Sequence, residues 1–180
     1  MVQKLLVKHG APTLAGIKTG NIFTVKDSQG RIDSEIRKLN RILLKKGLRL
    51  IPVRRTENAT LVYLFRPDRL KKDLQRPEAR EILMEKGYSC GDANICIVNL
   101  VQHLKLDASF PHEIGLFLGY PPSDVKGFME NPSEGVKCSG CWKAYGNECE
   151  AKRTFARYQS CTRAYEKAMQ CGMNLESLIV

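Results

Sequence analysis

The sequence predicts an α+β fold, in which a small antiparallel sheet with a packed helix is joined to a helical C-terminal half. Two β-rich runs, 48–54 and 60–65, are separated by a short turn-forming segment and predict a hairpin. From residue 147 onward, apolar and aromatic residues recur every three or four positions, as in a long amphipathic helix. The 180 residues suit a single domain, with a basic α/β part over about 1–88 and a helical part over about 89–180.

The N-terminal part is expected to begin with strands. A strand-like run over 5–7, a small-residue loop over 10–16, a strand over 21–25 and a turn over 27–30 follow one another. A helix then begins near Asp33 or Ser34, either of which could cap it, and Gly47 is placed to end it. Pro52 cannot donate a ladder hydrogen bond, so the first hairpin strand should be an edge strand or be bulged there.

The C-terminal part is expected to be a series of helices. Short helices should begin near Asp68, Pro77, Asp92, Pro111 and Ser123, with Gly87 ending the second of them. Residues 142–145 are expected to be extended, and the long helix that follows should end at Gly172. Its stripe of apolar residues is typical of a helix that faces a core.

The charge is unevenly distributed along the chain. The net charge is +10, and the first 80 residues hold 19 Lys and Arg against 7 Asp and Glu, whereas the rest hold 10 against 12. A basic half attracts phosphates, nucleic acid or other acidic partners. The alternative is a solvated basic face without a partner.

The length of the apolar runs and the number of cysteines indicate the cellular compartment of the protein. The apolar runs are much shorter than the ~18 residues that span a bilayer, and the N-terminus lacks the apolar core of a signal peptide. Seven cysteines, an odd number concentrated in the C-terminal half, do not suggest a disulfide framework. We therefore expect a cytoplasmic, non-membrane protein whose thiols fill the core, bind a metal or act in redox chemistry.

His112 and Glu113 are the first candidate catalytic residues. They stand side by side at a helix start and lead directly into an apolar, glycine-punctuated run. A histidine can carry protons near neutral pH, and a neighbouring carboxylate can tune it. Consecutive helix residues point about 100° apart, so the alternative is that both make only structural hydrogen bonds.

Cys138 and Cys141 form the turn C-S-G-C, which is similar to half of a zinc site. Zinc needs four ligands, so Cys149, Cys161, His103 or His112 would have to complete the set. On an ideal helix Cys149 and Cys161 lie ~120° apart, which disfavours a shared ion. Zinc or iron binding, a redox pair and unliganded thiols all stay open.

The segment G-A-P-T-L-A-G-I-K-T over 10–19 is similar to a phosphate-binding loop. Its spacing departs from G-x-x-x-x-G-K-[ST], and a strand, not a helix, is expected after it. A looser anion site using Thr13, Lys18 and Thr19 is possible, and a purely structural loop is the alternative.

A basic ridge is expected on the helix that follows. Arg37, Arg41 and Lys45 are spaced by four residues, opposite the apolar stripe. With Tyr63 and Phe65 on the hairpin, RNA binding is conceivable, although no RNA-binding motif is present.

Four segments carry a resemblance to a known family. They are A-P-T-L-A-G-I-K-T-G-N-I-F (11–23), F-P-H-E-I-G-L-F-L-G-Y-P-P-S-D-V-K-G-F (110–128), W-K-A-Y-G (142–146) and Y-x-x-C-T-x-x-Y (158–165). Together they resemble an uncharacterised bacterial family, a domain of unknown function found mainly in anaerobes. The resemblance spans nearly the whole chain and implies no reaction or cofactor. The site positions that it implies are Thr13, Lys18, His112, Glu113, Tyr120, Trp142, Tyr145 and Cys161.

These observations lead to three functional hypotheses. The first is a small-ligand-binding protein or small enzyme with a pocket between the two halves for an anionic or thiol-reactive molecule. In an enzyme, His112 would carry the proton, Glu113 would assist it and Lys18 would contact the anion; Tyr120 and Cys161 would complete the pocket. The second is a nucleic-acid-associated accessory protein, and the third is a metal-binding protein.

Overall fold

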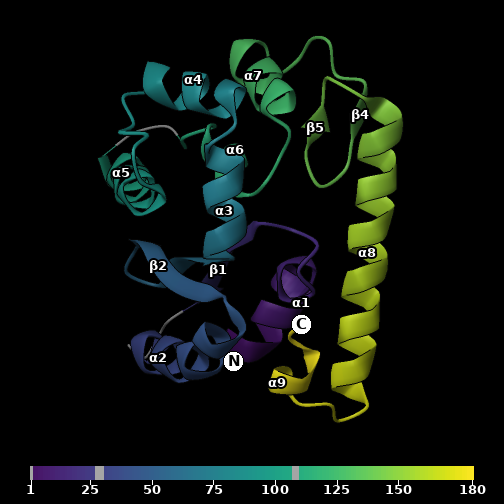
Figure 1. Ribbon diagram of the computed structural model, residues 1–180. Coiled ribbons are helices and arrows are strands. Elements are labelled where there is room, and N and C mark those ends of the chain that lie inside the picture. Colours follow the sequence, from purple (N-terminus) through teal and green to yellow (C-terminus); the bar gives the residue numbers. More distant parts are fainter. Residues whose placement is uncertain (1, 27–30, 107–109) are drawn as a thin grey trace. The chain divides into compact units, whose positions relative to one another are not determined.

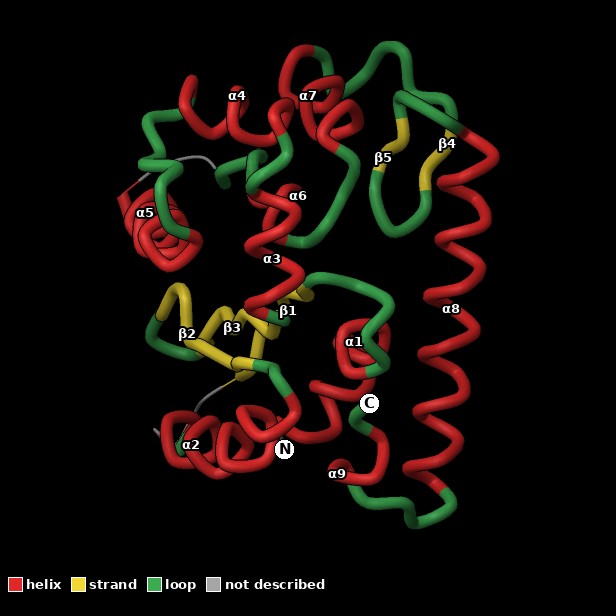
Figure 2. Tube along the Cα trace, viewed as in Figure 1, coloured by secondary structure: helices red, strands yellow, loops and turns green. Residues whose placement is uncertain are grey.

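The computed structural model describes residues 2–26, 31–106 and 110–180 and confirms the α+β fold (Figures 1 and 2). A three-stranded antiparallel sheet packs against helices, and most of the C-terminal half is helical. The chain forms two compact units. The first unit comprises residues 1–68 and 158–180, and the second comprises 69–157. The boundary expected near residue 88, between the basic α/β part and the helical part, therefore lies inside the second unit.

The sheet of the first unit contains the predicted hairpin. Strands β2 (Arg49–Arg55) and β3 (Ala59–Phe65) pair antiparallel, and β1 (Gly20–Lys26) pairs with the other side of β3. The strand order β1-β3-β2 makes β2 an edge strand, and its register shifts between Pro52 and Arg54. Both outcomes expected from Pro52, an edge position and an irregularity, are therefore present.

The prediction of a strand and a loop before β1 is wrong, because residues 2–14 form helix α1 (Val2–Leu14). Its buried residues include Leu6, Val7, Gly10 and Leu14, which recur at helical spacing. A Cβ on Gly10 would lie 2.7 Å from a methyl carbon of Leu64, so glycine permits close packing of α1 on the sheet. Pro12 lies inside the last turns of the same helix.

Helix α2 (Ile32–Leu43) continues into the short 3-10 helix η1 (Leu44–Lys46). Gly47 ends it in the left-handed conformation, with φ 69°, as expected. The predicted capping by Asp33 or Ser34 is wrong, since Arg31 occupies the N-cap position and Asp33 lies in the first turn. The turn expected over 27–30 lies outside the described residues.

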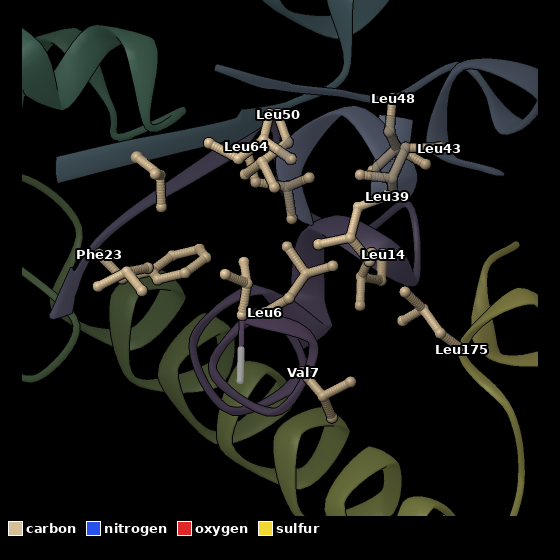
Figure 3. Packing of buried hydrophobic residues seen from close by; sticks show 14 of the residues in the cluster. Leu6, Val7, Leu14, Phe23, Leu39, Leu43, Leu48, Leu50, Leu64 and Leu175 are labelled. Atoms are coloured by element: carbon tan, nitrogen blue, oxygen red, sulfur yellow. The ribbon is translucent and has the colours of Figure 1, made fainter. Parts of the chain in front are cut away.

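The core of the first unit lies where α1 and α2 pack on the sheet. Figure 3 shows leucines of both helices converging on Leu50 of β2 and Leu64 of β3. The last helix, α9 (Leu175–Leu178), adds Leu175 to this cluster. Asn40 of α2 also holds the edge strand, because its amide both donates to and accepts from the backbone of Leu50 at 2.8 and 3.0 Å.

Short helices make up most of the second unit. They are α3 (Pro67–Leu74), which starts in the first unit, α4 (Pro77–Glu85), α5 (Ala93–Leu106), α6 (Ile114–Phe117) and α7 (Pro122–Glu130). As predicted, Pro77 begins α4, Gly87 follows it with φ 79°, and α5 begins directly after Asp92. The Asp92 carboxylate accepts from the backbone N–H of Asn94. Helix α7 begins at Pro122, next to Ser123 as expected, but Pro121 occupies its N-cap position, so Ser123 does not cap it.

A small hairpin and a long helix follow. Strands β4 (Cys138–Ser139) and β5 (Lys143–Ala144) pair antiparallel, which confirms an extended segment near 142–145. Helix α8 (Glu148–Gln170) confirms the predicted amphipathic helix, and Gly172 follows it with φ 85°. Within the described part of the chain, no helix is long and apolar enough to cross a membrane.

Candidate functional site

The second unit contains a cavity of about 230 Å³ with a mainly apolar and aromatic wall. Its lining residues come from α6, α7, the small hairpin and the segments before and between them: Phe110, His112, Ile114, Gly115, Tyr120, Asp124, Val125, Phe128, Trp142 and Lys143. Three of the site residues that the resemblance implied, His112, Tyr120 and Trp142, therefore line one cavity. A cavity of this composition, with a few polar groups, is typical of a small-molecule site.

Glycine shapes the turn between α6 and α7. Gly119 adopts φ 78°, a conformation that L side chains rarely take, and the Tyr120 amide then donates to the Gly115 carbonyl at 2.9 Å. A Cβ on Gly115 would lie 2.8 Å from a methyl carbon of Val125. The two helices can therefore approach closely only because residue 115 is glycine, and this approach places Tyr120 in the cavity wall.

Asp124 anchors the small hairpin to α7. Its side chain is buried, and its Oδ2 accepts from the Trp142 indole N–H at 2.7 Å. Its Oδ1 accepts from the backbone N–H groups of Tyr145 and Gly146 at 2.9 and 2.8 Å. A buried carboxylate is stable when such donors satisfy it. This single side chain therefore fixes both the indole and the backbone beside it.

Trp142 lies between two other aromatic rings. Its ring stacks on Tyr120 with centroids 4.8 Å apart, and it meets Phe155 edge-on at 4.5 Å. The Tyr120 hydroxyl donates to the Cys141 carbonyl at 3.1 Å. A Cβ on Gly140 would lie 2.3 Å from the Phe155 ring, so glycine is required where the hairpin turns over this ring. The indole is thereby held in one orientation.

His112 and Lys143 supply the basic groups of the cavity. His112 is exposed, and its ring meets Phe128 edge-on at 5.0 Å. The Lys143 ammonium lies 5.6 Å from the centre of the same Phe128 ring and donates to the Pro132 carbonyl at 2.8 Å. A cation over an aromatic face is favourable. Both basic groups thus gather around Phe128.

Glu113 belongs to a different cluster from His112. Its carboxylate is buried and its Oε1 accepts from the Tyr88 hydroxyl at 2.9 Å and lies 3.1 Å from the Nδ1 of His103. The Tyr88 and His103 rings meet at 4.6 Å. Within the described residues, Glu113 does not line the cavity that His112 lines. Its hydrogen bonds instead join α6 to α5.

Tyr145 packs against glycine behind the cavity wall. A Cβ on Gly127 would lie 2.6 Å from the Tyr145 ring, so α7 and the segment after β5 are in close contact. The Tyr145 hydroxyl is buried without a hydrogen-bond partner among the described residues. The side chain therefore contributes packing, and its backbone N–H contributes the bond to Asp124.

Thr13 and Lys18 lie in the first unit, where α1 ends. The Thr13 hydroxyl donates to Asn21 at 2.7 Å, and the backbone N–H groups of Ile17 and Lys18 both donate to the Pro12 carbonyl. These amides are therefore engaged by the chain itself. A helix C-terminus carries partial negative charge, which disfavours an anion there. The Lys18 side chain is buried, with its ammonium 5.8 Å from the centre of the Tyr158 ring.

Cys161 also lies in the first unit, on α8, half-buried. Burial raises the pKa of nearby Tyr165, and the Cys161 thiol adds to this rise, while Arg66 opposes it. Arg66 in turn donates to the carbonyls of Thr13 and Leu14, both at 2.8 Å. The motifs over 11–23 and 158–165 therefore meet in the first unit, and those over 110–128 and 142–146 meet in the second.

Cys138 and Cys141 lie at the small hairpin of the second unit. Cys138 is half-buried and, like Trp142, packs against the cluster of Ala144, Ala151 and Phe155, whereas Cys141 is exposed. Across residues 2–26, 31–106 and 110–180, no group of three or more His, Cys, Asp or Glu side chains could hold a metal ion. Zinc or iron at this pair stays a prediction, and no third ligand supports it among these residues.

Sequence reasoning missed Asp124, Phe128 and Lys143. The sequence offers little signal for Asp124, because Ser123 and Lys126 beside it are exposed and only Val125 shares its burial. Lys143 follows Trp142 directly, but nothing in its spacing reveals that it meets Phe128. That contact depends on how the small hairpin packs on α7.

The chain belongs to DUF3793, a family described as "protein of unknown function", whose family model matches residues 6–179. The resemblance to an uncharacterised domain family is thus confirmed. No curated protein and no solved structure matches the chain.

Proposed function

We propose that this DUF3793 protein binds a small molecule with a flat apolar body and an anionic group in the cavity of the second unit. The observation that carries the proposal is the pairing of an aromatic wall with two basic side chains, His112 and Lys143. Aromatic walls favour a flat apolar body, and convergent polar groups orient it.

The size of the cavity limits the ligand. Its volume is about 230 Å³. An apolar cavity of about 150 Å³ accepts benzene. A molecule about the size of a substituted benzene ring therefore suits the space, whereas a dinucleotide or a peptide does not.

The polar groups favour an anionic ligand over a cationic one. Asp124 is the acidic residue of the wall, and its two oxygens already accept three hydrogen bonds. His112 and Lys143 are exposed and can donate. A carboxylate, phosphate or phenolate on the ligand would accept hydrogen bonds from these donors. The positive charge of Lys143 would attract the negative charge of that group.

His112 is the group through which this site could transfer a proton. Its exposure at the cavity allows an imidazole to reach a bound molecule. Glu113 would act only indirectly, because its carboxylate is bonded to Tyr88 and His103. Binding is therefore the core of the proposal, and proton transfer by His112 is an extension of it. Thr13, Lys18 and Cys161 belong to the first unit and are not part of this proposal.

The test uses the intrinsic fluorescence of Trp142, which is the sole tryptophan of the chain and lines the cavity. Benzoate and phenyl phosphate serve as anionic probes, and benzamide serves as a neutral probe of the same shape. We expect saturable changes in emission with the anionic probes and weaker binding of benzamide. If none of these probes changes the emission up to their solubility limits, the proposed class of ligand is wrong.

Variants identify the basic groups. His112→Gln and Lys143→Gln should each weaken binding of the anionic probes by about 10-fold while leaving benzamide unchanged, since one charge-assisted hydrogen bond is lost. His9→Gln and Lys137→Gln are matched controls, because both residues are exposed and neither lines the cavity. An equal loss in the controls, or no loss in His112→Gln and Lys143→Gln, would contradict the proposed roles.

We also propose that the protein acts in the cytoplasm. Seven cysteine thiols, two of them in the turn C-S-G-C, suit a reducing compartment. Fractionation of the producing cells, with the protein recovered outside the cytoplasmic fraction, would overturn this location.

A further inference from the structure

The first unit carries a basic surface on α2, on η1 and at the start of β2. We define the basic surface as Arg37, Lys38, Arg41, Lys45, Lys46 and Arg49, all of which are exposed. From residue 36 to residue 56 the chain contains no Asp or Glu. The first unit holds 16 Lys and Arg against 7 Asp and Glu, so its excess positive charge is concentrated here.

Helix geometry puts the three members of the basic surface that lie on α2 on a single face. On an ideal helix Arg37, Lys38 and Arg41 fall within an arc of about 100°. The buried residues Ile36, Leu39 and Leu43 fall on the opposite side, where they join the core. Arg37 and Arg41 are four residues apart, and like charges at this spacing destabilise a helix. Solubility alone would be served as well by mixed charges, so the uniform sign calls for an acidic partner.

We propose that this basic surface binds the phosphate backbone of a double-stranded nucleic acid. The ridge from Arg37 to Lys45 spans eight residues, about 12 Å along the helix axis, which corresponds to about seven phosphate charges of a duplex. Arg55 is paired with Asp33 and is not part of the surface.

Two observations decide the mode of binding. Tyr63 and Phe65 are 1% and 2% exposed, with their rings stacked on each other at 4.6 Å, so they cannot stack on unpaired bases. The contact is therefore with phosphates and carries no base sequence preference. The apolar face of α2 lies in the core, so the helix cannot insert that face into a membrane, which disfavours a lipid surface.

The test measures binding to labelled 24-base-pair DNA and RNA duplexes of random sequence, by fluorescence anisotropy, from 50 to 200 mM NaCl. With about four to six phosphate contacts, affinity should fall by about 10²–10³-fold over this range. The triple variant Arg37→Gln, Arg41→Gln, Lys45→Gln should weaken binding at 50 mM NaCl at least 30-fold. It should also make the plot of log binding constant against log salt concentration less steep, with a slope smaller in magnitude by about 2.7.

The matched control removes three charges elsewhere. Lys71→Gln, Lys72→Gln, Arg80→Gln lowers the net charge equally, at exposed positions of the second unit. This control should keep the affinity of the unchanged protein within threefold, and circular dichroism confirms that both triple variants are folded. Equal losses in the two triple variants would show that net charge alone attracts the duplex and would overturn the proposal.

Other polyanions complete the test. Equal binding of polyglutamate, binding of vesicles containing phosphatidylserine without binding of duplexes, or absence of duplex binding at 50 mM NaCl would each overturn it. Because the cavity assay uses a different unit and different residues, its outcome is independent of this one.

Discussion

The buried carboxylate of Asp124 provides the sharpest test of how the second unit is held together. Replacement by asparagine keeps the size of the side chain but puts an NH₂ group where one oxygen was. That group faces either the Trp142 indole N–H or the backbone N–H groups of Tyr145 and Gly146, all of which are donors. At least one donor then loses its acceptor, and the remaining bonds lose their charge assistance.

The magnitude follows from these bonds. Hydrogen bonds to a charged group contribute roughly 1.5–3 kcal/mol each, and a buried donor without a partner costs about 1–3 kcal/mol. We therefore expect Asp124→Asn to lower the free energy of unfolding by about 2–4 kcal/mol. The total free energy of unfolding of a small protein is only about 5–15 kcal/mol, so this loss is large.

Urea unfolding followed by Trp142 fluorescence measures this change directly, since the indole is bonded to Asp124. With a slope of about 2 kcal/mol per molar urea, the midpoint should fall by about 1–2 M. Glu130→Gln is the matched control, because Glu130 is exposed on the same helix, and we expect it to stay within about 0.5 kcal/mol of the unchanged protein. If the Asp124→Asn midpoint moves no more than the control, the anchoring role of this carboxylate is refuted.

Two further predictions concern packing and thiol chemistry. Gly140→Ala should lower the free energy of unfolding by about 1–3 kcal/mol, because its Cβ would lie 2.3 Å from the Phe155 ring, whereas Gly91→Ala meets no atom within 4 Å and should be neutral in the same urea assay. Burial, with a smaller contribution from a neighbouring thiol, raises the pKa of Cys96 to about 11, so this thiol stays protonated at pH 8. Iodoacetamide at that pH should therefore modify exposed Cys149 long before Cys96, and peptide mass spectrometry showing equal rates would contradict this.

Local sequence signals were sufficient to predict the elements whose structure depends on neighbouring residues alone. The hairpin and the bulge at Pro52 followed from β-rich runs and from a residue that cannot donate. Helix α1 was missed because residues 5–7 were expected to form a strand and the small residues over 10–16 a loop. In the folded chain Gly10 is instead required by the contact with Leu64, and that contact joins segments more than fifty residues apart. No local pattern contains it.

The site, like the fold, was predictable only in part. The resemblance pointed to His112, Tyr120 and Trp142, which line the cavity. The pairing of His112 with Glu113 was inferred from adjacency, but adjacent residues at a helix start point in different directions. Glu113 consequently bonds to Tyr88 and His103. Tertiary contacts place His112 at the cavity and Glu113 against Tyr88 and His103, and these contacts cannot be inferred from the sequence.

Several residues of the second-unit motifs have a packing role that explains their presence. Gly115 and Gly127 permit close approach, and Asp124 satisfies three donors. His112 differs from them, because it is exposed although five of its six nearest C-terminal neighbours are apolar and all six, residues 113–118, are buried. Its loss should therefore leave the free energy of unfolding nearly unchanged while weakening ligand binding. If His112→Gln lowers the free energy of unfolding as much as Asp124→Asn does, His112 instead has a structural role.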